Sequence, residues 1–309
     1  VQSGDILDKE ARQRGNSVYL PGTVVPMLPE ALSNGLCSLR PHEDRACLAV
    51  EMIIDSSGNK QSHKFFQALI RSTARLTYTL VQQVIEGSLD EADCKVTSGT
   101  LHHLIGAFRT LHKSRNRRGT LNLNLCEARI KFDETDQPVS VTEHHQEEAH
   151  QLIEEFMIAA NICAAETLEQ AGESCVYRIH DQPDPEKIVS LRELTDALSL
   201  PFAKGQVITP HRFNELLMKV KDTDSETGVN EAVLRCQSRA VYSPDNIGHY
   251  GLGLTSYAHF TSPIRRYADL LVHRSLIKII TGKKVSRSST SKEKLNEICA
   301  AISKTEQTA

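Results

Sequence analysis

One stretch near the end of the chain, residues 257–274, most constrains what this chain can fold into, because it encodes the start of a helix beside two adjacent arginines. Thr261 or Ser262 is a good N-cap residue, and Pro263 suits the first helical position, where its missing N–H would be unpaired in any case. Apolar residues then recur at helical spacing as far as Ile277. We therefore predict a helix that begins at Pro263.

This predicted helix start is a candidate site for an anion. Arg265 and Arg266 would both lie in the first turn, next to free backbone N–H groups and the positive end of the helix dipole. A bound phosphate would relieve the repulsion between the two guanidinium groups. The alternative is that Arg265 pairs with Asp269 on a solvated face of the helix, and the cap sequence alone does not separate these interpretations.

The segment from His259 to Tyr267, which reads HFTSPIRRY, resembles the signature of the ribonuclease II / ribonuclease R family of 3′-to-5′ exoribonucleases, and it is most similar to bacterial ribonuclease R. The resemblance implies that Arg265 is catalytic and helps to hold and activate the scissile phosphate. It also implies that other residues of the segment bind RNA, namely His259, Thr261, Ser262, Arg266 and Tyr267.

Further blocks extend the resemblance over nearly the whole chain, at 19–29, 152–161, 178–180 and 302–306. The first implies that Tyr19 stacks near the 3′ end of the RNA, while a buried Tyr19 that braces a proline-rich loop is the alternative. The third adds Arg178 and His180 to the implied RNA-binding residues, although His180 also suits a hydrogen-bonded core position. Where relatives often carry a base-stacking aromatic residue this chain has Leu123, which covers a base less well than a ring does.

Magnesium in this family is held by a cluster of aspartates with the spacing D-x5-D-x-D-D, and such a metal stabilises the attacking and leaving oxygens of a phosphodiester. The sequence lacks that spacing: Asp5 and Asp8 are three residues apart, and Glu43 and Asp44 are isolated. In relatives the cluster comes a few tens of residues before the Tyr-Leu-Pro run, so here it would precede Val1. We expect magnesium in the intact parent protein, no metal ligand in this chain, and no cleavage by this chain alone.

The alternation of hairpins with long helices predicts an α+β fold, a single domain with antiparallel hairpins packed against long helices, and the resemblance implies that it is a single catalytic domain. The resemblance implies that residues 1–309 form a partial domain, without the metal-binding N-terminal part, the end of the C-terminal helix and an S1-type domain. We predict hairpins at 46–72 and 127–142, strands at 121–125, 177–180 and 249–254, and helices at 98–113, 147–169, 185–198, 209–221, 230–242 and 292–308.

Composition limits the classes of function. The net charge of −3 is not typical of a general nucleic-acid binder, but an RNA channel needs only local positive charge. The most basic run, 113–118, is either a rim of phosphate contacts or a solvated helix end. No apolar run is long enough to predict a membrane span, and the eight scattered cysteines fit reduced thiols of a cytosolic protein. We expect a cytoplasmic monomer whose partner is single-stranded RNA.

Two functional hypotheses follow. In the first, the chain is a fragment of an exoribonuclease catalytic domain, which in the intact parent hydrolyses single-stranded RNA to nucleoside 5′-monophosphates. In the second, it is a non-catalytic RNA-binding or protein-interaction remnant of that domain. Trimming of RNA from the 3′ end by this chain would contradict the placement of the metal ligands outside it.

Overall fold

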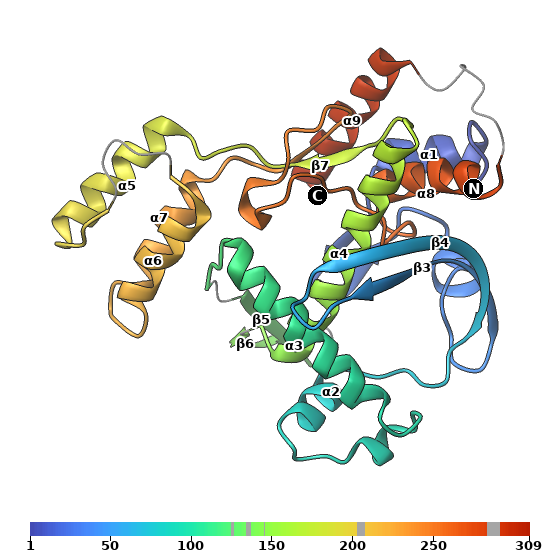
Figure 1. Ribbon diagram of the computed structural model, residues 1–309, viewed down its shortest axis with the longest axis horizontal. Helices are drawn as coiled ribbons and strands as arrows, with labels where there is room; N and C mark the ends of the chain where they lie inside the picture. Colours follow the sequence, from blue (N-terminus) through green and yellow to red (C-terminus); the bar gives the residue numbers. More distant parts are fainter. Residues whose placement is uncertain (125–126, 134–136, 145, 203–207, 283–290) are drawn as a thin grey trace.

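The computed structural model describes residues 1–309 except 125–126, 134–136, 145, 203–207 and 283–290, and its fold is a mixture of helices and short antiparallel hairpins (Figure 1). Within the described residues the strands form four two-stranded sheets. The pairs are β1 (Val18–Leu20) with β2 (Thr23–Val25), β3 (Asp44–Ile54) with β4 (Lys60–Arg71), β5 (Glu127–Phe132) with β6 (Pro138–His144), and β7 (Tyr177–Ile179) with β8 (Val241–Ser243). The predicted α+β class is confirmed.

The long helix α4 (Glu148–Gln170) runs through the centre of the fold. It is apolar on more than one face, so it is stable only where other elements cover it on several sides. Hairpin β3–β4 and α8 cover one part of it, with Phe65 and Phe260 meeting edge to face at 5.2 Å. The other helices are α1 (Ile6–Arg14), α2 (Tyr78–Ile85), α3 (Thr100–Arg118), α5 (Pro185–Ala197), α6 (Pro210–Val220), α7 (Glu226–Cys236), α8 (Tyr267–Ile280) and α9 (Lys292–Thr308).

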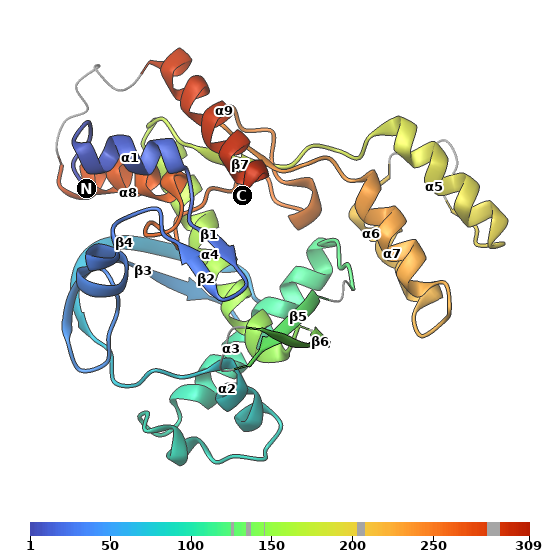
Figure 2. The ribbon, with the colours of Figure 1, turned by 180° about the vertical axis from the view of Figure 1, so that it is seen from behind.

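A second apolar cluster joins α1, α8 and α9 and includes Ala11, Ala268 and Ile302. Asp5 caps the start of α1 by accepting from the backbone N–H of Asp8, and Gly15 ends that helix at a φ of 72°. Both views of the ribbon show α1 lying beside α8 (Figures 1 and 2). The start of the chain is thereby fixed against the helix that follows the two arginines.

Helices α5, α6 and α7 form an arm that extends away from the rest of the molecule (Figures 1 and 2). The arm has a core of its own, in which Phe213 and Val233 are fully buried. Its base is closed by a hydrogen bond of 3.1 Å from the backbone N–H of Asp184 to the carbonyl of Cys236. The arm therefore leaves and rejoins the body between the paired strands β7 and β8.

The predicted start of the helix after the arginines is wrong by four residues. Helix α8 begins at Tyr267, and Arg266 stands before it in extended conformation with φ −137° and ψ 126°. Asn16 forms a β-bridge with Arg266, and the backbone N–H of Tyr267 donates to the carbonyl of Gly15 at 2.8 Å. Pro263 lies in the turn that precedes the helix, because this pairing with the chain after α1 holds residue 266 outside the helical region.

Three further predictions of secondary structure are wrong. Residues 121–124 are irregular, because their backbone N–H groups bond to Gly251 and to the side chains of Asn214 and Asn230; Leu125 lies outside the described residues. Residues 249–254 contain a short 3-10 turn instead of a strand, since His180 and His249 accept from the N–H groups of residues 251 and 252. The helix predicted at 230–242 occurs at 226–236, because residues 241–243 pair with β7.

Candidate functional site

The loop before α8 is held by two buried polar side chains from different helices. Asn161 of α4, 2 % exposed, accepts through Oδ1 from the backbone N–H groups of Phe260 and Thr261 at 2.8 and 3.3 Å. Asp269 of α8, 0 % exposed, accepts from the backbone N–H of Ser262 at 2.7 Å. Three consecutive backbone N–H groups are therefore satisfied by side chains. We conclude that the backbone of this loop is fixed, because buried donors are costly to release.

Of the two adjacent arginines, Arg266 forms an ion pair. Its Nε and Nη2 donate to the two carboxylate oxygens of Asp269 at 2.7 and 2.8 Å, a bidentate pair. Burial opposes the charged form of Arg266, but the hydrogen bonds to Asp269 outweigh burial and raise the pKa of this guanidinium. Arg266 therefore acts as a structural counter-ion inside the loop.

Arg265 differs from its neighbour, because its side chain is exposed and forms no hydrogen bond or ion pair with another described residue. The alternative that Arg265 pairs with Asp269 is wrong, since the two oxygens of that carboxylate are taken by Arg266 and Ser262. The expected free N–H groups of a first helical turn are also missing at Arg265, whose N–H donates to the carbonyl of Ser262 at 3.1 Å. Any anion at this site would therefore meet the guanidinium itself.

The structure brings Tyr19 into the same region. The backbone N–H of Ser17 donates to the carbonyl of Arg265 at 2.9 Å, and Tyr19 follows two residues later in β1. Tyr19 is 61 % exposed, so the alternative of a buried tyrosine bracing the loop is wrong. An exposed aromatic ring and a free guanidinium thus stand on neighbouring chain segments.

A ladder of rings connects His180 with the loop. The ring centroids of His180 and His249 lie 5.0 Å apart, those of His249 and Tyr257 5.5 Å, and those of Tyr257 and His259 5.7 Å. Burial lowers the pKa of all three histidines, that of His249 to about 3, so they are neutral at pH 7. His180 accepts from the N–H of Gly251 through Nδ1 and contacts the carbonyl of Ser238 through Nε2, which is the hydrogen-bonded core position considered above.

The remaining predicted residues lie around this ladder. Arg178 pairs with Glu306 of α9 at 2.5 Å and places its guanidinium 4.7 Å from the ring centre of Tyr242. Tyr242 in turn shares a hydrogen bond of 2.9 Å with Nδ1 of His259. Tyr267 is 2 % exposed, and its hydroxyl donates to Asp8 at 2.8 Å. Thr261 and Ser262 are half-buried beside the two arginines.

Two residues important for this arrangement, Asn161 and Asp8, were not singled out as site residues from the sequence. Asn161 is the polar residue within the otherwise apolar run 156–163, and that contrast is the signal that could have identified it. Asp8 accepts from Tyr267 and from Arg274 at 2.7 Å, which ties α1 to α8. Nothing in its local sequence indicates partners so distant along the chain.

The basic run 113–118 lies at the end of α3. Within it, Arg115 pairs with Glu154 and Glu155 of α4 at 2.8 and 2.7 Å. Leu123 is half-buried and packs against the core of the arm. Its side chain therefore contributes to the junction between arm and body.

A magnesium site does not fit the residues at hand. In the described part of the chain no group of three or more His, Cys, Asp or Glu side chains could hold a metal ion. Asp5 caps α1 and Asp8 is paired with Arg274, so neither carboxylate is free. None of the helices searched within the described ranges has the length and apolar character that crossing a membrane requires.

Comparison with known proteins identifies the class. Residues 1–282 match the RNB domain, and the chain therefore belongs to the RNB domain family. It is 42 % identical to Ribonuclease R of Escherichia coli (strain K12) over 291 residues, which are 94 % of this chain and 36 % of that protein. The chain thus spans about a third of the length of this relative.

Solved structures agree with the sequence comparison. The apo form of Mycoplasma genitalium RNase R matches with a TM-score of 0.93 at 31 % identity, over 99 % of this chain and 49 % of that one. That protein has also been solved in complex with ribose-methylated single-stranded RNA and with double-stranded RNA. Yeast Ssd1, a pseudonuclease, matches with a TM-score of 0.76 at 25 % identity, over 99 % of this chain and 37 % of that one.

Proposed function

We propose that this chain is part of the catalytic domain of a 3′-to-5′ exoribonuclease that hydrolyses single-stranded RNA to nucleoside 5′-monophosphates. The observation that carries the proposal is the difference between the two adjacent arginines. Arg266 is neutralised by Asp269, whereas Arg265 is exposed on a fixed loop and has no anionic partner in the described part of the chain. A preorganised cation of this kind is suited to stabilise charge on a phosphate.

Each residue has a distinct role in this proposal. Arg265 contacts the scissile phosphate, and Tyr19 stacks on a base near the 3′ end, as base–aromatic stacking is favourable for any base. Arg266, Asp269 and Asn161 position the loop that carries Arg265. Residues that contact the RNA or support those contacts are Arg178, His180, His259, Thr261, Ser262 and Tyr267.

Magnesium belongs to this proposal only in the intact parent protein, where it would activate water and stabilise the leaving oxygen. The described residues of this chain provide no cluster for it. We therefore propose that this chain alone binds single-stranded RNA without cleaving it. We further propose that it is a cytoplasmic monomer that contributes to RNA degradation.

The test uses a short oligoadenylate labelled at its 5′ end, with binding followed by fluorescence anisotropy and cleavage by gel electrophoresis in magnesium buffer. We expect binding that weakens as salt rises and no shortening of the RNA. Arg265→Ala should weaken binding by about tenfold, the effect of losing one charge-assisted contact. The matched control is Arg235→Ala, which removes a 78 % exposed arginine of the arm.

Two results would contradict parts of the proposal. Equal binding by Arg265→Ala and the unaltered chain would remove Arg265 from the RNA site. Stepwise trimming of the RNA by this chain would show that it holds its own metal ligands. In the intact parent, Arg265→Ala should lower the rate of hydrolysis by roughly a hundredfold, because a preorganised donor contributes about 3 kcal/mol to such transition states.

A non-catalytic role is the second candidate, and one comparison favours it. The pseudonuclease Ssd1 has this fold, so the fold alone does not require hydrolysis. This candidate predicts that RNA binding persists in the parent protein while magnesium-dependent trimming is absent. The cleavage assay on the parent therefore separates the two functions.

A further inference from the structure

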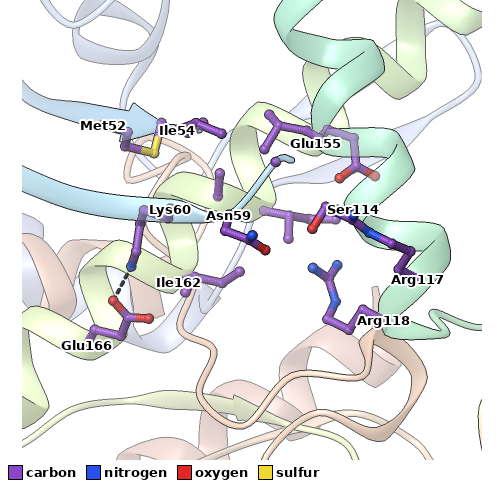
Figure 3. Close-up of a pocket in the computed structure, with 14 residues that line it drawn as sticks. Met52, Ile54, Asn59, Lys60, Ser114, Arg117, Arg118, Glu155, Ile162 and Glu166 are labelled. Carbon is purple, nitrogen blue, oxygen red and sulfur yellow. Dashed lines mark hydrogen bonds and ion pairs between the residues drawn. The ribbon is translucent and has the colours of Figure 1, made fainter. Parts of the chain in front are cut away.

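A pocket of about 500 Å³ lies between the turn of hairpin β3–β4, the second half of α3 and the middle of α4 (Figure 3). Its volume is within the range of roughly 300–1,000 Å³ typical of small-molecule sites. The turn is pressed against α3, since a Cβ on Gly58 would lie 2.5 Å from the carbonyl oxygen of Thr110. The pocket contains no residue of the loop 257–267.

The acidic side chains of this pocket are already neutralised by neighbours. Glu166 forms an ion pair with Lys60, drawn as a dashed line in Figure 3. Glu155 pairs with Arg115 of α3 at 2.7 Å. The lining carries three cationic side chains, Lys60, Arg117 and Arg118, against the two carboxylates, so its net charge is positive.

Two basic groups of the lining form no ion pair with a carboxylate of the described residues: Arg117, which is exposed and donates to the carbonyl of Ser57, and Arg118, which is half-buried. The contacts of Arg118 are to neutral groups. Its Nε donates to the carbonyl of Leu252 at 3.0 Å and its Nη2 to the hydroxyl of Thr120 at 3.4 Å, and neither acceptor carries a charge. No carboxylate of the described residues forms an ion pair with it. Burial lowers the pKa of Arg118, and the more distant Glu155 offsets this only in part. The position of Arg118 would thus be improved by an anion in the pocket.

The walls of the pocket indicate the rest of the ligand. Figure 3 shows the guanidinium of Arg118, the amide of Asn59 and the hydroxyl of Ser114 around a common space. Met52 and Ile162 border the same space with apolar surface. A guanidinium matches the paired oxygens of a phosphate, amide and hydroxyl groups match sugar hydroxyls, and apolar walls match the face of a base.

We propose that this pocket is a binding site for a nucleoside monophosphate, with its phosphate on Arg118, its sugar near Asn59 and Ser114, and its base against the apolar wall. The site is separate from the loop of Arg265 and does not depend on exoribonuclease activity. Under the proposed function the ligand has the chemistry of the reaction product, so occupancy would report product concentration.

The test is titration of the chain with adenosine 5′-monophosphate by isothermal calorimetry. Arg118→Gln should weaken binding at least tenfold, as expected for loss of a charged hydrogen bond. Ala159→Leu, which adds volume at the α4 wall without changing charge, should weaken it similarly. Arg109→Gln is the matched control, since Arg109 is on the same helix and 57 % exposed. Circular dichroism establishes that each variant is folded.

Several outcomes would overturn the proposal. One is that Arg265→Gln loses binding of adenosine 5′-monophosphate while Arg118→Gln retains it. Another is that the unaltered chain does not bind this nucleotide at millimolar concentration. Equal affinities for inorganic phosphate and for the nucleotide would show that the apolar wall plays no part. A larger effect of Arg118→Gln on oligoadenylate than on the nucleotide would make the pocket part of an RNA path. Since Arg265 variants test the proposed function and Arg118 variants test this pocket, the two can fail independently.

Discussion

At the scale of single residues, Asn161 shows how one buried amide fixes the loop before α8. Its Oδ1 accepts two backbone N–H groups of the loop, and its Nδ2 donates to the hydroxyl of Tyr257 at 3.0 Å. Both the oxygen and the nitrogen of the amide are therefore hydrogen-bonded, and truncation of Asn161 would leave two backbone N–H groups of the loop and one hydroxyl without these partners. Such a residue is expected to influence stability and the position of Arg265 together.

Asn161→Ala should destabilise the fold by about 1–3 kcal/mol, the cost of leaving buried polar groups unsatisfied. The measurement is urea unfolding followed by circular dichroism. Asn116→Ala on the exposed face of α3 is the control and should change stability by less than about 0.5 kcal/mol. A destabilisation of Asn161→Ala no larger than that of the control would show that the loop is held by other contacts.

The sequence singled out the two adjacent arginines, but it did not predict that Arg266 pairs with Asp269 while Arg265 remains exposed. Asp269 is four residues from Arg265 and three from Arg266, and both spacings allow an ion pair on a helix. The β-bridge between Asn16 and Arg266 holds Arg266 in extended backbone, and this determines that Arg266 is the arginine that pairs with Asp269. Contacts between residues so distant in sequence cannot be derived from spacing.

At the scale of elements, α1 is attached to α8 through Asp8. Its carboxylate accepts from the N–H of Gly4 at 2.6 Å, from Tyr267 and from Arg274. Burial would raise the pKa of Asp8, but these hydrogen bonds outweigh it and the pKa is lowered from 3.8. The ionised carboxylate therefore stabilises the folded state at neutral pH, and this stability is lost as the pH falls through the folded pKa.

Asp8→Asn should lower the free energy of unfolding at pH 7 by about 2 kcal/mol, as expected for a hydrogen-bonded charged group. The difference from the unaltered chain should shrink as the pH falls below about 4, because protonation then removes the same charge. Urea unfolding at several pH values measures both effects. Glu10→Gln in the exposed pair with Arg14 is the control and should cost less than about 1 kcal/mol; a pH-independent difference for Asp8→Asn would contradict the argument.

Most long elements were predictable from the sequence, and so was the short strand β7, whereas short segments that are fixed by distant side chains were not. Helix α4 and hairpin β3–β4 follow from their apolar patterns over many residues, and both are confirmed. The turn at 250–252 and the irregular segment at 121–124 are fixed by side chains from other parts of the chain, such as His180 and Asn214. A local pattern of alternating leucines or glycines contains no information about those partners.

At the scale of the whole molecule, burial of histidines links stability to pH. Burial lowers the pKa of histidines in several parts of the fold, namely His63, His180, His249, His259 and His273. Each has an unfolded pKa near 6.5 and a lower folded pKa, so the unfolded chain binds more protons between these values. Stability is therefore complete above about pH 6.5 and decreases as the pH falls.

We expect the free energy of unfolding to fall between pH 6 and pH 5 with a slope above that of one histidine, which is about 1.4 kcal/mol per pH unit. His249→Gln should reduce the slope by about one proton, because His249 has the folded pKa of about 3. His103→Gln is the control, since that side chain is exposed. Chemical unfolding at closely spaced pH values measures the slope, and a flat profile across this range would contradict the prediction.

The arm has a consequence for how this architecture can vary. Strands β7 and β8 are direct neighbours in register, Ile179 opposite Val241, so topologically the arm is an insertion at the tip of a small hairpin. The body also holds the arm through residues 121–124, whose backbone N–H groups bond to the side chains of Asn214 and Asn230 and whose leucines pack against its core. Residues inserted in the turn between α6 and α7 should therefore leave the pairing of β7 with β8 unchanged, whereas removal of α6 and α7 should release the backbone of residues 121–124.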